Sequence, residues 1–403
     1  ALKANPDLQA ALAALRVAQE NARAQYGTLL PAVDASYSPT RQKVADPLSS
    51  PLSSGQPLFS LHTAQVNVSY VADVFGANRR QVESLEAQEA SQRFQLEAAR
   101  VTLAANTVAA AVQLASLRAQ IAATEHTIDE SRQQLVLMHR QLDLGAIAEA
   151  AVVAQQAALA QTQAALPPLR RQLAQQRDLL AALSGSLPAE AEIEDFDLSD
   201  LQAPDSLPLS LPSNLVEQRP DVRAAEAQLH AASAQIGVAT ANMLPQITLG
   251  ANAGGAATRF ADLFTSGTGF WSIAAGVTQP LFQGGALLHR KRAAEAAFDQ
   301  AAAQYRSTVI TAFQNVADVL EAIRSDADAL DSAQRAEQAT AESLSVARRQ
   351  MELGDIAYLA LLAAEQAHQQ ALVALAQARA ARLTDAAALF QALGGGWWNA
   401  ARE

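Results

Sequence analysis

The sequence predicts a mixed α and β membrane protein in which one structural unit occurs twice along the chain. Three observations support this fold class. The composition is typical of long helices, similar segments recur in the two halves, and short stretches switch from a helical apolar period to a strand period. In each half we therefore expect a helix, a β-hairpin, a long helix and a shorter return helix.

The composition favours long helices that pack closely. Apolar residues make up 50% of the 403 residues, with many alanines, whereas aromatic residues make up only 5%. Alanine- and glutamine-rich segments with a helical period are typical of long helices or coiled coils. The net charge of −11 argues against nucleic-acid binding, which needs a basic face. The chain has no cysteine and six dispersed histidines, so we expect neither a metal site nor a cofactor.

The first helix of each half has the same signature. The segment "NPDLQAALAALRVAQENARAQYGTLLP" at 5–31 is similar to "RPDVRAAEAQLHAASAQIGVATANMLP" at 219–245. Proline and aspartate in the first turn favour a helix start. The closing Leu-Pro ends the helix, because a residue before proline avoids the α conformation.

Alternating apolar and polar residues follow each first helix and predict β-hairpins at 32–75 and 246–280. Alternation of this kind is typical of barrel strands with lipid outside and water inside, although two half-buried hairpins on a soluble domain would also show it. No run of 18 apolar residues occurs, so we expect no transmembrane helix. The residues predicted to face lipid are Val66, Val68, Tyr70, Leu249, Trp271, Ile273 and Val277.

Long helices are predicted at 78–143 and 285–352, each about 100 Å long at 1.5 Å per residue. Each is followed by a glycine, Gly145 or Gly354, of the kind that caps helices in the left-handed conformation. Apolar periodicity resumes at once, so the chain turns there and runs back. The return helices are expected at 146–183, where Pro167 and Pro168 should interrupt the helix, and at 356–393.

These elements divide the chain into two structural repeats and two connecting segments. The first repeat covers residues 1–184 and the second covers 213–393. The acidic, proline-rich segment 185–212 links them along the outside of the helices, and a tail follows at 394–403. In each repeat the first helix and the return helix together match the long helix in length. They are therefore expected to stack end to end beside it.

Five segments make the sequence resemble the outer-membrane efflux factor family, the exit ducts of tripartite pumps. The resemblance is closest to the branch that partners resistance-nodulation-division transporters, and it extends over essentially the whole chain. The segments are "LPPLRRQLAQQRDLLAALSG" (166–185), "EQRPDVRAAEAQLHAASAQIGVATANMLPQITLGANAG" (217–254), "TQPLFQGG" (278–285), "ELGDIAYLALLAAEQ" (352–366) and "ALGGGWW" (392–398).

The resemblance implies a homotrimer with a 12-stranded outer-membrane β-barrel, continued by a long periplasmic α-helical barrel. An equatorial belt would come from 185–212 and the C-terminal tail. The protein would be a passive duct in the outer membrane of a Gram-negative bacterium, in contact with outer-membrane lipid. It would release drugs or other small toxic molecules delivered by an inner-membrane transporter through a periplasmic adaptor. Family members of this branch usually begin with a lipid-modified cysteine, which this chain does not contain.

The resemblance also assigns roles to the two helical turns. Acidic rings around the narrowest part of a trimer would form a periplasmic gate. Tyr358 would either hydrogen-bond across this aperture or pack the seam between helices. Many family members carry acids where this chain has Ala360 and Ala363, so an inner acidic ring would be absent. The gate residues are Asp143, Glu149, Glu352, Asp355 and Tyr358, and the adaptor-docking residues are Leu144, Gly145, Ala146, Leu353 and Gly354.

No catalytic constellation is visible, so the sequence predicts a protein that is not an enzyme. It has no phosphate-binding loop and no dinucleotide-binding glycine fingerprint. Two other classes stay open from the residues alone. A periplasmic adaptor also has long helical hairpins, but only one of them, flanked by glycine-rich halves. A soluble coiled-coil scaffold would explain the helices but not the strands.

Overall fold

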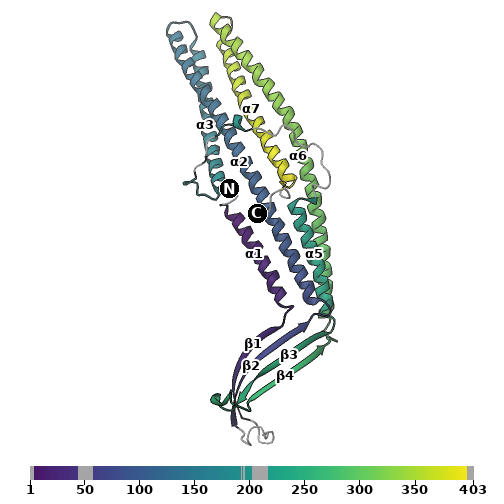
Figure 1. Ribbon diagram of the computed structural model, residues 1–403. Helices are drawn as coiled ribbons and strands as arrows, with labels where there is room; N and C mark the ends of the chain where they lie inside the picture. Colours follow the sequence, from purple (N-terminus) through teal and green to yellow (C-terminus); the bar gives the residue numbers. More distant parts are fainter. Residues whose placement is uncertain (1–3, 44–57, 192, 194–195, 202–216, 397–403) are drawn as a thin grey trace. The chain divides into compact units, whose positions relative to one another are not determined.

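The computed structural model describes residues 4–43, 58–191, 193, 196–201 and 217–396, which form two compact units. Unit 1 comprises 1–13, 94–223 and 307–403, and unit 2 comprises 14–93 and 224–306. The elements, shown in Figure 1, are α1 (Pro6–Gly27), β1 (Ala32–Lys43), β2 (Leu58–Ala72), α2 (Ala77–Asp143), α3 (Glu149–Ser184), η3 (Leu198–Asp200), α5 (Pro220–Ala241), β3 (Gln246–Ala257), η4 (Phe260–Asp262), β4 (Gly269–Thr278), α6 (Ala286–Leu353) and α7 (Tyr358–Ala392).

Among the described residues of unit 2, four strands form one antiparallel sheet in the order β1-β2-β3-β4 (Figure 1). The hairpin partners β1 and β2 pair from Ala32–Ser69 to Lys43–Leu58. Strand β2 also pairs with β3, which joins the two predicted hairpins into one sheet. Among the described strands, β1 and β4 are the edges of this sheet.

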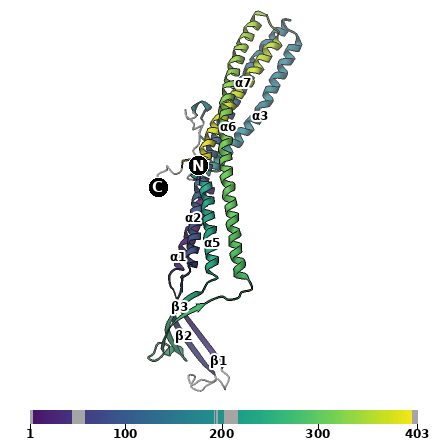
Figure 2. The same cartoon turned by 90° about the vertical axis from the view of Figure 1, so that its right-hand side faces the viewer.

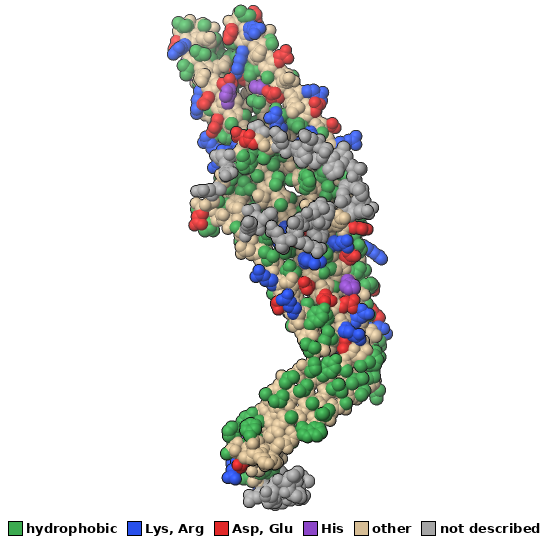
Figure 3. Space-filling model, in the orientation of Figure 1, with side chains coloured by type: hydrophobic (Ala, Val, Ile, Leu, Met, Phe, Trp, Pro, Cys, Tyr) green, Lys and Arg blue, Asp and Glu red, His purple; other side chains and the backbone are tan. Residues whose placement is uncertain are grey.

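The pairing register gives the sheet an apolar face and a polar face. Directly paired residues share a face, and successive residues alternate between faces. All seven residues predicted to face lipid fall on the apolar face, where Trp271, Ile273 and Val277 are 69–78% exposed. Charged side chains are concentrated over the helices and are sparse over the sheet (Figure 3).

Hydrogen-bonded polar side chains cross the opposite face of the sheet. One row runs through Asp34, Asn67, Asn252 and Ser272 on the four strands. The Asn67 amide donates to the Asp34 carboxylate at 2.9 Å, and the Ser272 hydroxyl donates to Asn252 at 3.0 Å. The pairing register decides which residues lie on each face of the sheet. A shift of one strand by one residue would therefore move its apolar side chains to the polar face.

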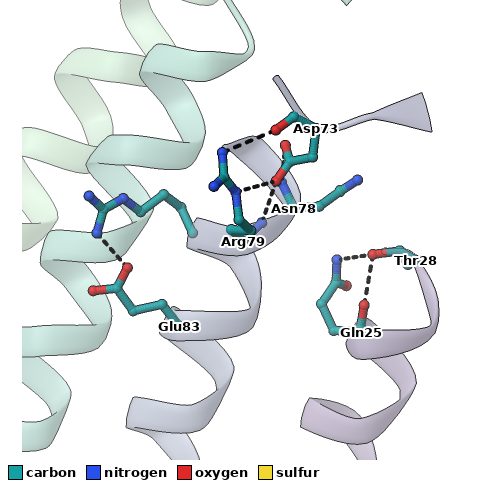
Figure 4. Close-up of polar contacts among 7 residues, drawn as sticks. Gln25, Thr28, Asp73, Asn78, Arg79 and Glu83 are labelled. Atoms are coloured by element: carbon teal, nitrogen blue, oxygen red, sulfur yellow. Dashed lines mark hydrogen bonds and ion pairs between the residues drawn. The ribbon is translucent and has the colours of Figure 1, made fainter. Parts of the chain in front are cut away.

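Asp73 links the end of β2 to the start of α2 (Figure 4). Its carboxylate accepts hydrogen bonds from the backbone N–H groups of Asn78 and Arg79, at 3.1 and 2.9 Å. The Arg79 guanidinium returns to the same carboxylate and donates to the Asp73 carbonyl. A carboxylate at a helix N-terminus satisfies free donors and complements the helix dipole. The change from strand to helix is therefore fixed locally.

In unit 1, two helix ends meet through buried polar side chains. The Asn5 Oδ1 atom accepts from the N–H groups of Asp7 and Leu8, which caps α1, while its amide donates to the Leu183 carbonyl at 3.1 Å. The last turn of α3 is thereby tied to the first turn of α1. The following glycine, Gly185, lies so close to Ala4 that a Cβ atom there would be 2.3 Å from the Ala4 carbonyl oxygen.

A buried arginine occupies the corresponding place at the start of α5. The Arg219 guanidinium donates to the carbonyl of Ala392, the last residue of α7, at 2.8 Å, and to the Ala312 carbonyl of α6 at 3.4 Å. Its other nitrogens pair with the Asp221 carboxylate at 2.6 and 3.0 Å. Backbone and carboxylate oxygens thus surround a charge that would be costly to bury alone. The end of α7, α6 and the start of α5 meet at this side chain.

Two expectations about the return helices need correction. They begin at Glu149 and Tyr358, after the predicted starts at 146 and 356, because each is preceded by an extended alanine, Ala148 or Ala357. Pro167 and Pro168 do not interrupt α3, which continues from Glu149 to Ser184. Proline removes a backbone donor and crowds the preceding turn, so packing overrides a strong local preference here.

The expectation about membrane-spanning helices also needs qualification. Among the described residues one helix, α2, contains an 18-residue window with a mean hydropathy of 1.2 and few charges, apolar enough by composition to cross a membrane. Within α2, however, Ser116 is buried and donates to the Ala376 carbonyl of α7. Alanine-rich helices that pack in bundles reach the same hydropathy.

Two carboxyl groups interact across the seam between α6 and α7. Asp385 on α7 faces Asp326 on α6. Burial, followed by the charge and hydrogen bond of Asp326, raises the pKa of Asp385 to about 6. Two neighbouring carboxylates cannot both ionise cheaply, so the pair holds a proton that a solvated aspartate would have lost.

We therefore expect the stability contributed by this pair to be fully present below about pH 4, the pKa of an unfolded aspartate, and lost as the pH rises through about 6. The Asp385→Asn variant should lose less stability than the unchanged protein between pH 4 and 7. Thermal unfolding of the detergent-solubilised protein at a series of pH values measures this difference. Parallel pH profiles for the two proteins would contradict it.

Candidate functional site

The turn between α2 and α3 is closed by a glycine in the left-handed conformation. Gly145 has φ of 69°, and its N–H donates to the Leu142 carbonyl at 2.8 Å. The Ala146 N–H donates to the Gln141 carbonyl, also at 2.8 Å. This pair of bonds is the Schellman motif, which satisfies carbonyls that a helix end leaves free. The glycine ends α2, as its place in the sequence predicts.

The turn between α6 and α7 has the same hydrogen-bond pattern. Gly354 has φ of 79° and donates to the Met351 carbonyl at 3.1 Å, while Asp355 donates to the Gln350 carbonyl at 2.9 Å. Both turns lie at the same end of unit 1 (Figures 1 and 2). A Cβ atom at either glycine would meet nothing within 4 Å. The positive φ, rather than a lack of space, therefore favours glycine.

Each turn presents an exposed leucine at its apex. Leu144 is 83% exposed and Leu353 is 70% exposed, and each directly precedes the capping glycine. Ile147 and Ile356, just beyond the glycines, fold back against the buried cluster of the helices. The chain thus partly buries one large apolar side chain at each turn and leaves another in solvent.

Four predicted gate residues, Asp143, Glu149, Glu352 and Asp355, are exposed around these turns. Within the described residues none of the four forms an ion pair. Asp143 and Glu352 lie at the C-terminal ends of α2 and α6, where the helix dipole disfavours negative charge. Arg140 is a basic residue in the last turn of α2, but α6 has none in its last turn. The turns are therefore locally negative.

The fifth predicted gate residue, Tyr358, lies in a different environment. It is only 6% exposed and packs in a cluster with residues from α2, α3, α6 and α7. Its hydroxyl has no hydrogen-bond partner among the described residues. Of the two roles predicted for Tyr358, this environment fits packing of the seam. The other buried members of the cluster are Met138, Val152, Leu344, Ala347 and Leu361.

A group of charged residues beside this cluster was not anticipated from the sequence. The Arg348 guanidinium of α6 lies 2.9 Å from the Glu130 carboxylate of α2. Burial raises the pKa of Glu365 on α7, while Arg348 opposes that rise and Glu130 adds to it. Burial, and then the charge of Glu365, raises the pKa of the Tyr358 hydroxyl. No local motif marks these residues, because they meet only when three helices pack.

Ala360 and Ala363 are exposed on α7, one and two turns beyond Gly354. Among the described residues, no group of three or more His, Cys, Asp or Glu side chains is arranged to hold a metal ion.

Comparisons with known proteins identify the family of this chain. The sequence model described as "Outer membrane efflux protein" matches residues 1–186 and 211–395. The "Probable efflux pump outer membrane protein TtgC" of Pseudomonas putida is 31% identical over 98% of this chain and 81% of its own length. Other relatives at 29–31% identity are named for toluene efflux, antibiotic efflux and pyoverdine export.

Solved structures share the fold. The outer-membrane channel OprN superposes with a TM-score of 0.91 at 29% identity, covering 98% of this chain and 88% of its own. The outer membrane protein VceC of Vibrio cholerae superposes with a TM-score of 0.88 at 27% identity, covering 98% and 94%.

The burial of Tyr358 generates a test of its role. Replacing its unpartnered hydroxyl by hydrogen in Tyr358→Phe should leave stability unchanged or raise it slightly, because no hydrogen bond is lost. Tyr358→Ala should destabilise the helices by about 3–5 kcal/mol through the cavity left in the cluster. Denaturant unfolding of the two variants measures the difference. A loss in Tyr358→Phe as large as that in Tyr358→Ala would show that the hydroxyl, not the ring, matters.

Proposed function

The chain belongs to the outer membrane efflux protein family, and from this membership we infer that it is the outer-membrane channel of a tripartite efflux system. It is located in the outer membrane of a Gram-negative bacterium and extends into the periplasm. Family membership decides against the adaptor and the coiled-coil scaffold that the residues alone left open. It also supports a protein without enzymatic activity, since members are efflux channels.

One observation supports the finer architecture, namely a sheet with one apolar face and two open edges. β1 and β4 each have one free edge among the described strands. Unpaired backbone groups cost several kcal/mol each in lipid, so spanning strands must close into a barrel. Four strands are too few to enclose a channel, whereas three chains supply twelve. We propose a homotrimer in which β1 of each chain pairs with β4 of the next.

We also propose that the chain is an internal two-fold repeat, with repeats at 1–184 and 213–393. The family model matches in two segments of similar length, and the two helical turns have the same hydrogen bonds. The segment 185–212 and the tail 394–403 would form the equatorial belt. Much of both lies outside the described residues, so this assignment rests on the family resemblance.

The negative turns are proposed to form the periplasmic gate. In a trimer each exposed carboxylate occurs three times around one axis, and like charges at a constriction repel one another and favour cations. Exposed ion pairs are worth at most about 1 kcal/mol, so no single contact with Arg140 or Arg349 should hold such a gate. Tyr358 is proposed to set the packing of the α6–α7 turn behind the acids.

The adaptor is proposed to dock on the apices of the turns, at Leu144, Gly145, Ala146, Leu353 and Gly354. Energy and selection of cargo would come from the inner-membrane transporter. The relatives named for toluene, antibiotics and pyoverdine suggest that a duct of this fold serves chemically different cargo. The polar face of the sheet fits this role, since its described residues are small or neutral apart from Asp34.

The trimer can be tested by cross-linking β1 to β4. The chain has no cysteine, so one cysteine in each edge strand gives only designed disulfides. Within one chain β1 and β4 are three strand spacings apart, about 14 Å, which is beyond disulfide reach. Ala35→Cys combined in turn with cysteines along 270–277 should therefore produce chains linked in threes. The read-out is non-reducing electrophoresis after mild oxidation.

Ala35→Cys alone, which leaves β4 without a cysteine, serves as the negative control. A protein that stays monomeric at every tested β4 position would contradict the proposed barrel. A heat-modifiable trimer without any edge disulfide would contradict the β1–β4 closure but not the trimer.

Docking on the turns can be tested through the exposed leucines. Leu144→Ser combined with Leu353→Ser should leave the trimer stable, because both side chains are largely in solvent. Loss of two apolar anchors of about 2 kcal/mol each should reduce adaptor affinity by several hundredfold and abolish efflux. The measurements are adaptor binding to the purified trimer and drug susceptibility of cells. Leu187→Ser, at a leucine 64% exposed outside the turns, is the control. Normal efflux in the double variant would exclude the apices as the docking surface.

A further inference from the structure

Charged residues in the strands are segregated by sign between the two faces of the sheet. Within the described strands, Asp34 is on the polar face, whereas Arg41 and Lys43 are on the apolar face opposite Ser60 and Leu58. Both basic residues lie near the end of β1, the end remote from α1. The face proposed to meet lipid thus carries positive charge at its extracellular end and nowhere else in its strands.

The position of these charges matches the expected edge of the lipid. On β2 the apolar face runs from Ala72 to His62, which is about 33 Å along the strand. At a tilt of about 40° this corresponds to about 25 Å along the barrel axis, the usual height of an outer-membrane apolar band. Arg41 pairs with Ser60, the next residue of this face beyond His62. Arg41 and Lys43 therefore begin where the apolar band ends.

An aromatic group marks this boundary. The Tyr37 hydroxyl is 2.8 Å from Nδ1 of His62, and the two rings are stacked with centroids 6.2 Å apart. The Phe260 ring lies edge-on to both, at 5.8 and 6.2 Å. Phe260 is largely exposed, as is Phe264 in the same loop. Rings with apolar bodies and polar edges accumulate where hydrocarbon meets headgroups.

The loop that carries these phenylalanines is held against the sheet. Leu263 is 1% exposed, and its carbonyl accepts a hydrogen bond from the Thr268 hydroxyl at 2.9 Å. The Thr268 carbonyl in turn accepts from the Ala256 N–H of β3. Gly255 permits this close approach, because a Cβ atom there would lie 2.4 Å from the Leu263 carbonyl oxygen. The exposed rings are therefore fixed in place without being buried.

From this arrangement we propose that Arg41 and Lys43 bind the phosphate groups of lipopolysaccharide in the outer leaflet. This inference rests on the proposed outer-membrane function, and it names the lipid contacted and the residues that contact it. Arg41 and Lys43 are exposed, and within the described residues neither side chain forms an ion pair. Arginine and lysine are the side chains that recognise phosphate best. The trimer would present three such sites, each just beyond the aromatic residues.

The test compares two variants with equal changes in charge on opposite faces of one strand. Arg41→Gln with Lys43→Gln removes two positive charges from the apolar face. Thr40→Glu with Gln42→Glu adds two negative charges at neighbouring positions on the polar face. Each basic side chain near an anionic lipid surface contributes about fivefold to binding. The first variant should therefore bind lipopolysaccharide about 25-fold more weakly, and the second should bind nearly as the unchanged trimer does.

Binding is measured by titrating the purified trimer in detergent with fluorescent lipopolysaccharide, and separately with its dephosphorylated form. The unchanged trimer should discriminate between the two forms, and Arg41→Gln/Lys43→Gln should not. Equal binding of both forms by the unchanged trimer would overturn the proposal. So would equal losses in the two variants. The heat-modifiable trimer is scored in the same samples, so a failure of lipid binding is distinguishable from a failure of the barrel.

Discussion

Backbone hydrogen bonding at the edges of the four-stranded sheet is the constraint on which the other parts of this molecule depend. β1 and β4 each leave one row of donors and acceptors without a described partner, and one face of the sheet is apolar. Water could satisfy those edges but would not favour the apolar face, whereas lipid would favour that face but cannot satisfy the edges. Closure with other chains satisfies both requirements. In the proposed trimer, closure of the barrel also arranges the long helices in a ring.

A second constraint acts where two helices that are far apart in the sequence meet end to end. This occurs at the contact of α1 with α3 and at the contact of α5 with α7, called joints here. Asn5 at the α1–α3 joint and Arg219 at the α5–α7 joint both lie before a Pro-Asp pair and both donate to the last turn of a return helix. The short amide of Asn5 is long enough to link the two helix ends of the α1–α3 joint. A guanidinium also reaches the Ala312 carbonyl of α6, so the second joint ties three helices. The two halves thus share a plan but differ in how firmly their helix ends are fixed.

The turns between α2 and α3 and between α6 and α7 carry exposed acidic and leucine side chains that the packing of the helices does not require. Asp143 and Glu352 lie where the helix dipole disfavours them, and Leu144 and Leu353 are exposed beside them. These residues are exposed and contribute little to folding, which is consistent with the proposed roles of the turns in the gate and in docking. Tyr358, by contrast, is buried behind the turn, where its ring packs in the apolar cluster of the helices. If the turns form the proposed gate and docking surface, different residues within a few positions of one another carry support and function.

The sequence by itself determined the elements of this protein, because their signals are local. Glycine with positive φ ends α2 and α6, and the period-2 alternation identified which strand residues share a face. The tertiary structure alone decided what depends on contacts between distant segments. It joined two hairpins through β2 and β3, buried Tyr358 and kept α3 helical through Pro167 and Pro168. It also brought Arg219 to Ala392 and paired Arg348 with Glu130. Contacts between distant segments produce no pattern at a fixed spacing in the sequence, so they can be identified only in the folded structure.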